Sequence, residues 1–593
     1  PATGRAAGEY RTIEVESLKI TFDSEWANRT SPGYFPVRVD ITNLGGARVI
    51  EIVGEGTRFL RSTRSMSTGS TEISQRVRLA RGDRVRLTIP VPVFGVNENI
   101  RFEIRENGKT LERLNYTSLQ SGSAASDAPA LIVADRASAR GAVMGTWLRS
   151  TAGAVGTGSY TVSGSGISAH PGALSVAPSR GYSSMPPTDF MLPPSRLPTN
   201  WLGYTSLRAV VIGPTEWEQL DEAQKNALLT WTACGGDLVF VDGDLKTLLP
   251  NASPAASPAE EGSARAYFFG RIHRPISAAI TLSGLTAFLA RAQTLQDGSF
   301  ALPANTTGDW GKIAARGFRL PIPGVAGIPA RAYVAILLLF SLIIGPANYW
   351  FLRRKGQQVL LVLTAPLIAA AFIVVLAGYV IAGEGFGVRG RVASFTMLDQ
   401  ARNQAVTRSS LSVYAAGMTP SGGWRVGRDV AVFPIGTEGT GTGERLDLDL
   451  SEAQRFSAGL IQARSPTNVE QIAFRPARER LTFTREGSGT TVVNGLGTTV
   501  TALVYRDGNT FGLLDERLPP GGKATLRTSG NGVANLVPKD LPLWPRFIHL
   551  AQHQPAGSYL AVIDRSPFVD PGVPDLAERG SFHFVLGWPG GQP

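Results

Sequence analysis

The sequence predicts a multidomain α+β membrane protein with β-sandwich domains, one α/β domain and a hairpin of two transmembrane helices. Two long apolar segments without a charged residue, 332–352 and 359–382, are separated by one short basic turn. Alternating strand-like segments dominate both ends of the chain, which is typical of half-buried β-strands. Ahead of the hairpin, continuous apolar runs alternate with a helical segment, as expected of an α/β layer.

These patterns divide the chain into seven predicted parts. They are a β-sandwich (1–126), an α/β domain (127–300) with an excursion (151–200), a linker to the membrane (301–331), two transmembrane helices (332–352 and 359–382), a turn between them (353–358) and one or two C-terminal β-rich domains (390–593).

The two apolar segments each match the roughly 20 residues that an α-helix needs to cross a bilayer core of about 30 Å. A pair of buried core helices is the alternative, but such long uncharged runs are rare in soluble cores. Because the connecting turn is short, both ends of the hairpin must lie on the same side of the membrane.

The basic turn indicates which side that is. Arg353, Arg354 and Lys355 lie in the short turn, and short loops rich in Lys and Arg stay in the cytoplasm. Basic residues at the other end of the hairpin, Arg331 and Arg389 among them, reduce this asymmetry. We therefore predict a two-pass protein of the cytoplasmic (inner) membrane with both large parts extracytoplasmic, and we expect a cleaved signal peptide ahead of Pro1.

Other hairpin residues have predicted roles in anchoring and shape. Tyr349, Trp350 and Tyr379 suit the membrane–water interface. Pro346 and Pro366 are expected to kink the two helices, because proline removes a backbone hydrogen bond. Asn348 could form a hydrogen bond across the helices.

The N-terminal part is predicted to be an immunoglobulin-like sandwich. Residues 35–41 and 101–105 alternate between apolar and polar side chains. Asn107-Gly108 follows the second of these segments, and this pair favours a tight hairpin turn. The region after the membrane has the same character, with expected strands at 500–505 and 559–563.

The α/β domain is predicted from three continuous apolar runs and one helix. The runs, at 130–134, 209–212 and 237–241, are typical of strands covered on both faces. A helix is expected over 218–234, ended by Gly235-Gly236. Residues 267–272 resemble a further strand.

The strand at 210–212, the helix from 220 to 234 and the segment 235–241 resemble the class I glutamine amidotransferase-like fold. The overall layout is similar to that of bacterial membrane-anchored proteins with this α/β domain between β-sandwiches, and so is the segment 345–354 at the end of the first membrane helix. Members of this group are mostly uncharacterised, so the resemblance implies an architecture more than an activity.

An active amidotransferase of this fold would carry a nucleophilic cysteine on a strand-to-helix turn, partnered by a histidine. The chain has one cysteine, Cys234, predicted at the C-terminal end of a helix. The helix dipole is negative there and disfavours a thiolate. We therefore predict a degenerate domain with no catalytic residue.

No cofactor or metal site is predicted either. Of the five histidines, His549 and His553 are four residues apart and could share a helical face, but the segment between them lacks the glutamate of a zinc protease motif. The glycine-rich segment 436–443 lacks the lysine of a phosphate-binding loop, and 163–166 does not match a nucleophile elbow.

The formal charge of +11 over 593 residues comes from scattered arginines. Nucleic-acid binding requires a basic cluster or stripe, so no nucleic-acid partner is predicted. The leading hypothesis is a non-enzymatic extracytoplasmic scaffold, or accessory subunit of a membrane protein complex, whose partners are other membrane or periplasmic subunits and the lipid bilayer. The alternatives are a hydrolase or amidotransferase-like enzyme, and a sensor of a small ligand or cell-wall fragment that uses the α/β domain.

Overall fold

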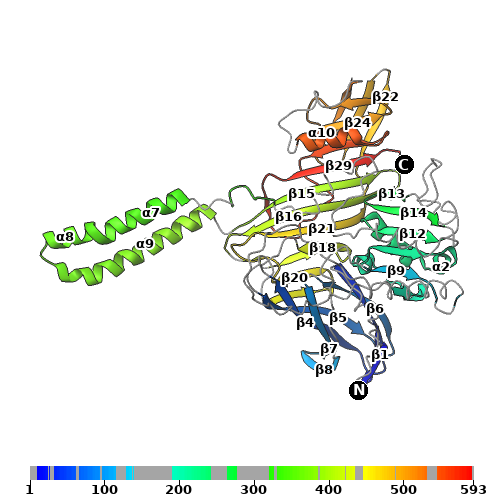
Figure 1. The fold of residues 1–593 in the computed structure, drawn as a ribbon, viewed down its shortest axis with the longest axis horizontal. Helices are drawn as coiled ribbons and strands as arrows, with labels where there is room; N and C mark the ends of the chain where they lie inside the picture. The colour runs from blue at the N-terminus through cyan, green and yellow to red at the C-terminus, as the bar shows by residue number, and fades with distance from the viewer. Residues whose placement is uncertain are drawn as a thin grey trace, which may run out of the picture.

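The fold is described from a computed structural model of the chain. It covers residues 10–23, 26, 33–61, 66–93, 96–114, 129–135, 138, 190–241, 264–276, 320–325, 330–384, 387–417, 419–420, 422–434, 445–487, 489–529 and 544–590. The described strands form four sheets, and one long pair of helices projects from the body that these sheets build (Figure 1).

The N-terminal part is a sandwich of two antiparallel layers. One layer has the order β1-β2-β3-β6, with β1 at Tyr10–Val15, β2 at Leu18–Asp23, β3 at Gly33–Asn43 and β6 at Arg84–Val93. The second contains β4 (Arg48–Arg61), β5 (Met66–Leu79), β7 (Val96–Glu106) and β8 (Lys109–Leu114). Phe22 and Phe102 meet between the layers with ring centroids 6.0 Å apart. The predicted turn joins β7 to β8, with Asn107 at φ 49° and Gly108 at φ 77°.

The second layer continues into strands from far along the chain. Beyond β5 it adds β19 (Arg445–Asp449), β20 (Gln454–Ala458) and β17 (Trp424–Val426). Strand β19 runs parallel to β5 and places Leu448 opposite Ile73. The predicted division between 1–126 and 390–593 therefore does not separate two independent bodies, because the later segment completes the sheet of the earlier one.

The α/β part has a sheet of order β10-β9-β11-β12-β14-β13, parallel except for its last strand. Its strands are β9 (Ala130–Val133), β10 (Phe190–Leu192), β11 (Ala209–Ile212), β12 (Asp237–Val241), β13 (Ala264–Tyr267) and β14 (Gly270–Ile276). The helix predicted over 218–234 is α3 (Glu222–Ala233), which starts later than expected at a capping box of Asp221 and Gln224. A separate short helix, α2 (Pro214–Glu218), precedes it. The excursion at 151–200 is described only from Phe190 onward.

The strand predicted over 267–272 is interrupted. Tyr267 ends β13 and Gly270 begins β14, and residues 268–269 form a tight turn between them, with Phe268 at φ 51°. The Phe269 N–H donates to Ala233 O at 3.0 Å, which ties this turn to the end of α3. Gly236 packs there against Trp231, so closely that an added Cβ would lie 2.4 Å from the indole ring.

The C-terminal part is built on one long, curled sheet. Its order is β18-β21-β16-β15-β29-β27-β24-β25-β26-β23-β22, and β28 pairs with β15 beside it. The strands are β15 (Val388–Asp399), β16 (Gln404–Ala415), β18 (Val430–Pro434), β21 (Thr467–Pro476), β22 (Arg480–Glu486), β23 (Gly489–Gly495), β24 (Val500–Asp507), β25 (Thr510–Leu513), β26 (Lys523–Ser529), β27 (Tyr559–Ile563), β28 (Ala577–Glu578) and β29 (Phe582–Trp588). The curl brings Phe483 of β22 onto Tyr505 of β24, with stacked rings 4.3 Å apart. Helix α10 (Trp544–His553) packs on β29 through Phe547 and Phe584.

The apolar hairpin consists of α7 (Ala330–Leu342), the π-helical turn η6 (Ile343–Ala347), α8 (Asn348–Arg354), the 3₁₀ turn η7 (Gln358–Leu360) and α9 (Leu361–Glu384). The two predicted helices are confirmed, and both are long and apolar enough to cross a membrane. The hairpin extends from one side of the body and does not pack into it (Figure 1).

Candidate functional site

The outer surface of the hairpin is apolar and exposed. In the helix Val334–Arg354, 6% of the most apolar stretch is buried. In the helix Gln358–Gly378, none of that stretch is buried. Large side chains such as Leu338, Val362 and Ile373 are each more than 60% exposed. A core helix of a soluble protein would be mostly buried, so these helices lack the environment of a protein core.

A small set of contacts holds the two helices together. The Asn348 side chain is 8% exposed and donates a hydrogen bond to Thr364 Oγ1 at 2.9 Å, as the sequence suggested. Phe340 and Phe372 also meet across the hairpin, with ring centroids 5.0 Å apart. Pro346 lies inside the π-helical turn, where the α-helical bonding pattern is interrupted. Helix α9 continues without interruption through Pro366, so the kink expected there stays a prediction.

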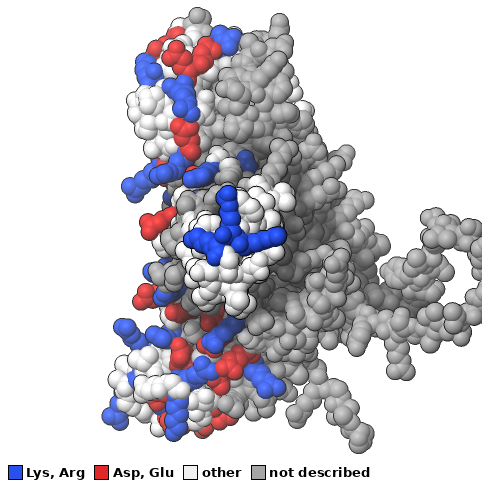
Figure 2. All heavy atoms as spheres, turned by 90° about the vertical axis from the view of Figure 1, so that its left-hand side faces the viewer, with Lys and Arg blue, Asp and Glu red and all other residues white. Residues whose placement is uncertain are grey.

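The tip of the hairpin combines basic and aromatic side chains. The Arg354 guanidinium lies 4.7 Å from the Trp350 ring centroid, and the Lys355 ammonium lies 4.5 Å from that of Phe351. Arg353 lies in the same last turn of α8. Seen along the hairpin from its tip, this basic cluster stands on a largely uncharged stem (Figure 2).

The aromatic residues expected at the membrane interface are placed in part. Tyr349 and Trp350 are 47% and 60% exposed on α8. Tyr379 lies near the end of α9, outside the described side chains. Their contact with an interface stays a prediction.

The base of the hairpin is fixed to the body from both ends. Ahead of α7, Ile322 is buried with Tyr414 and Ala416, so the end of the predicted linker packs on the body. After α9, the Ala416 N–H donates to Gly387 O at 3.4 Å. The described segments before and after the hairpin therefore both contact the end of β16.

The three soluble parts meet around one buried tyrosine. Tyr34 of β3 is fully buried, and its hydroxyl donates to Gln454 Oε1 at 2.9 Å and accepts from the Val432 N–H at 3.2 Å. Its backbone N–H donates to Thr205 Oγ1 at 2.8 Å, in the α/β part. Burial raises the pKa of the Tyr34 hydroxyl, so it stays protonated as a donor. The periodicity of the sequence gave no indication of this contact.

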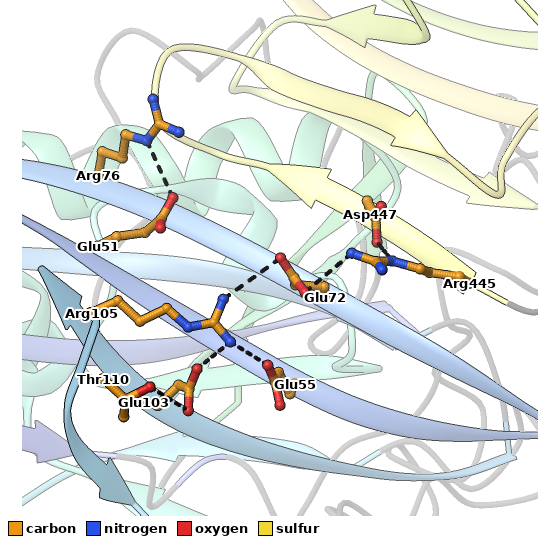
Figure 3. A network of polar contacts seen from close by, with 9 residues as sticks. All are labelled: Glu51, Glu55, Glu72, Arg76, Glu103, Arg105, Thr110, Arg445 and Asp447. Atoms are coloured by element: carbon orange, nitrogen blue, oxygen red, sulfur yellow. Dashed lines mark hydrogen bonds and ion pairs between the residues drawn. The ribbon is translucent and has the colours of Figure 1, made fainter. Parts of the chain in front are cut away.

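A second connection crosses the outer face of the N-terminal sandwich (Figure 3). Arg105 of β7 contacts Glu55 of β4, Glu72 of β5 and Glu103 of its own strand. Arg445 of β19 reaches Glu72 at 3.4 Å. Further members of the network are Glu51, Arg76, Thr110 and Asp447. Ion pairs thus accompany the parallel pairing of β5 and β19.

Cys234 lies where the sequence predicted, at the C-terminal cap of α3. Its side chain is fully buried, and this burial raises the pKa of the thiol. A buried, protonated thiol at the negative end of a helix is unsuited to act as a nucleophile.

The histidines are dispersed over the body. His553 is exposed at the end of α10, and the side chain of His549 in the same helix is outside the described residues, as is His170. His273 is buried 3.0 Å from Asp237 in the α/β sheet. His583 is buried beside Ser394, whose Oγ lies 2.8 Å from Nδ1. Within the described residues, no three metal-ligating side chains gather. The segments 163–166 and 436–443 are outside the described part.

Comparison with known proteins identifies only the first sandwich. Residues 17–119 match a family described as a domain of unknown function (DUF8726). Curated proteins gave no match. Among solved structures, the chain is similar to the mu-homology domain of yeast delta-COP-I, complexed with a Dsl1 WxWxV peptide. The identity is 6% and the TM-score 0.16, over 34% of this chain and 96% of that one. A likeness at this TM-score carries no argument about function.

Proposed function

We propose that the protein is a membrane-anchored, non-enzymatic scaffold whose apolar hairpin crosses the cytoplasmic membrane, with both large parts on the extracytoplasmic side. The observation that carries the proposal is the hairpin, which exposes its apolar side chains along two membrane-length helices. In water this surface would be unfavourable by about 25 cal/mol for each Å² of apolar area. A bilayer removes that cost.

The contacts inside the hairpin support an anchoring role. A hydrogen bond between Asn348 and Thr364 satisfies polar groups that lipid cannot. No charged residue lies within the apolar stretch of either helix, and intramembrane charges usually mark ion or proton pathways.

The body supports the scaffold part of the proposal. The Tyr34 contacts and the shared sheet of β5 and β19 join the regions on both sides of the hairpin into one unit. Such a unit would present a fixed surface to partner subunits of a membrane complex. Purification in mild detergent tests this part: stoichiometric copurifying chains are expected, and a strictly monomeric protein would contradict it.

Membrane topology can be tested with single cysteines. Cys234 is fully buried, so Lys355→Cys at the tip and Ala458→Cys on the body each add one accessible thiol. An impermeant maleimide should label position 458 from outside intact cells and position 355 only in inverted vesicles. Labelling of both from the same side would show that the hairpin does not cross the membrane, and the opposite pattern would reverse the orientation.

A further inference from the structure

Four arginines gather at the base of the hairpin, at the end of the sheet where β15 begins. Arg389 and Arg391 belong to β15, which begins soon after α9 ends at Glu384. Arg579 is held there because its backbone N–H donates to Gly390 O at 2.9 Å. The Arg464 N–H donates to Ala415 O at 2.8 Å, and Ala415 pairs with Val388 of β15. Backbone hydrogen bonds therefore bring arginines from three distant segments to one end of the sheet.

Within the described part of the chain, only one of the four side chains forms hydrogen bonds to the body. Arg391 donates to Gly580 O at 2.8 Å and Pro321 O at 3.0 Å, and so connects the segment ahead of α7 to the body. Arg464 and Arg579 are exposed and Arg389 is half-buried. These three form no ion pair with any described residue. The Glu578 carboxylate, next to Arg579 in the sequence, lies 3.9 Å from His583 Nε2 and forms no ion pair with any of the three arginines.

We propose that Arg389, Arg464 and Arg579 form a binding site for the phosphate of anionic phospholipid headgroups at the membrane surface around the hairpin. The inference rests on the proposed membrane insertion, since insertion places the base of the hairpin at headgroup depth. Guanidinium groups suit phosphate because they offer several donors in a planar fork. Lys and Arg side chains lie beside the hairpin on the face that would meet the bilayer, with Asp and Glu side chains among them (Figure 2).

The site would also fix the orientation of the body relative to the membrane. Arg391 already connects β15 to the segment that enters α7, and its neighbours would hold the surrounding headgroups. Tip and base would then each contact anionic lipid, in opposite leaflets. The three base arginines differ from the tip cluster in that one lies in β15 and the other two are joined to the end of that sheet by backbone hydrogen bonds.

The test compares lipid selectivity in the full-length protein. It is reconstituted in nanodiscs with trace spin-labelled phosphatidylglycerol or phosphatidylcholine, and the motionally restricted fraction of each label gives a relative association constant. The triple variant Arg389→Gln, Arg464→Gln, Arg579→Gln should lose phosphatidylglycerol selectivity by at least about fivefold, the factor equivalent to ~1 kcal/mol for one basic residue at an anionic surface. The control Arg81→Gln, Arg84→Gln, Arg485→Gln has the same change in net charge at exposed arginines that form no ion pair with a described residue, and should retain the selectivity.

The outcomes that would overturn the proposal differ in what else they affect. A restricted component absent for both lipids would contradict membrane insertion and hence the proposed function as well. A restricted component with equal affinity for both lipids, or a selectivity that survives in the triple variant, would contradict only the headgroup site. Unchanged selectivity with loss of a copurifying protein would assign the three arginines to a protein partner. Inorganic phosphate added at about 10 mM, enough to compete at a weak ion site, should leave the selectivity intact. If phosphate abolished the selectivity, the site would be assigned to free phosphate.

Discussion

Replacing Tyr34 with phenylalanine tests whether the regions on the two sides of the hairpin form one body. The substitution keeps the buried ring and removes only the hydroxyl. Gln454 Oε1 and the Val432 N–H then lose the partners they have at 2.9 and 3.2 Å. The amide nitrogen of Gln454 keeps its bond to Gly427 O at 2.9 Å, so the glutamine is expected to stay in place with its oxygen unsatisfied.

The expected cost follows from these two groups. Leaving a buried donor or acceptor without a partner costs about 1–3 kcal/mol each, and removal of the hydroxyl itself offsets part of it. We expect a local destabilisation of about 2–4 kcal/mol, which corresponds to a roughly 30- to 900-fold loss of amide protection, at about 1.36 kcal/mol for each factor of ten.

Hydrogen exchange followed by mass spectrometry measures this directly. Peptides that cover β18 and β20 should lose protection, although the substitution lies in β3. Tyr505→Phe is the matched control, because that half-buried ring stacks on Phe483 and its hydroxyl has no hydrogen bond within the described residues. A Tyr34→Phe protein that exchanges like the Tyr505→Phe protein would refute the proposed connection.

Two further predictions concern a buried histidine and the hairpin. Burial lowers the pKa of His583 to about 4, so the folded protein binds fewer protons than the unfolded chain between about pH 4 and the ordinary histidine value of about 6.5. The free energy of unfolding is therefore expected to fall as the pH drops through this window, by up to about 3 kcal/mol. In urea titrations, His583→Gln should show a smaller dependence of this free energy on pH, and an unchanged dependence would contradict the role given to His583. Asn348→Leu should weaken the helix pairing of the hairpin by about 0.6 kcal/mol in detergent unfolding titrations, Thr364→Val should do the same, and additive losses in the double variant would contradict their hydrogen bond.

Local features of the fold could be predicted because their causes are local. The Asn107-Gly108 pair determines its own turn, since both residues tolerate positive φ. The apolar helices are evident from composition alone. The turn at Phe268 was missed for the opposite reason: aromatic residues favour strands, and a positive φ is uncommon for them. The contact between Phe269 and the end of α3 stabilises a conformation that the local sequence disfavours.

The pairing of β19 with β5 could not be predicted from the sequence. Leu446 and Leu448 alternate with charged residues as in any half-buried strand, and nothing in that pattern specifies a partner. The same limit applies to the arginines at the base of the hairpin. Arg389, Arg464 and Arg579 are scattered along the chain, and only the sheet brings them together.

This long-range pairing leads to a final prediction about how the protein is divided into domains. Leu448 is 2% exposed and lies opposite Ile73 of β5, itself 1% exposed. An aspartate at position 448 would place an unpaired charge in this core and should release β19. Because β19 covers the edge of β5, exchange should then rise in residues 66–79, more than 350 positions away in the sequence.

The extent of the deprotection distinguishes one shared body from separate domains. With Leu448→Asp, peptides from β5 and β19 should lose protection together, while Leu448→Met, which nearly conserves volume, should leave both protected. Protection retained in β11 would show that the variant is still folded. If exchange rose only within 445–458, the N-terminal sandwich would be independent of the strands that follow the membrane. If β5 responds, the hairpin is an insertion within a single body, and the segments before and after it belong to the same folding unit.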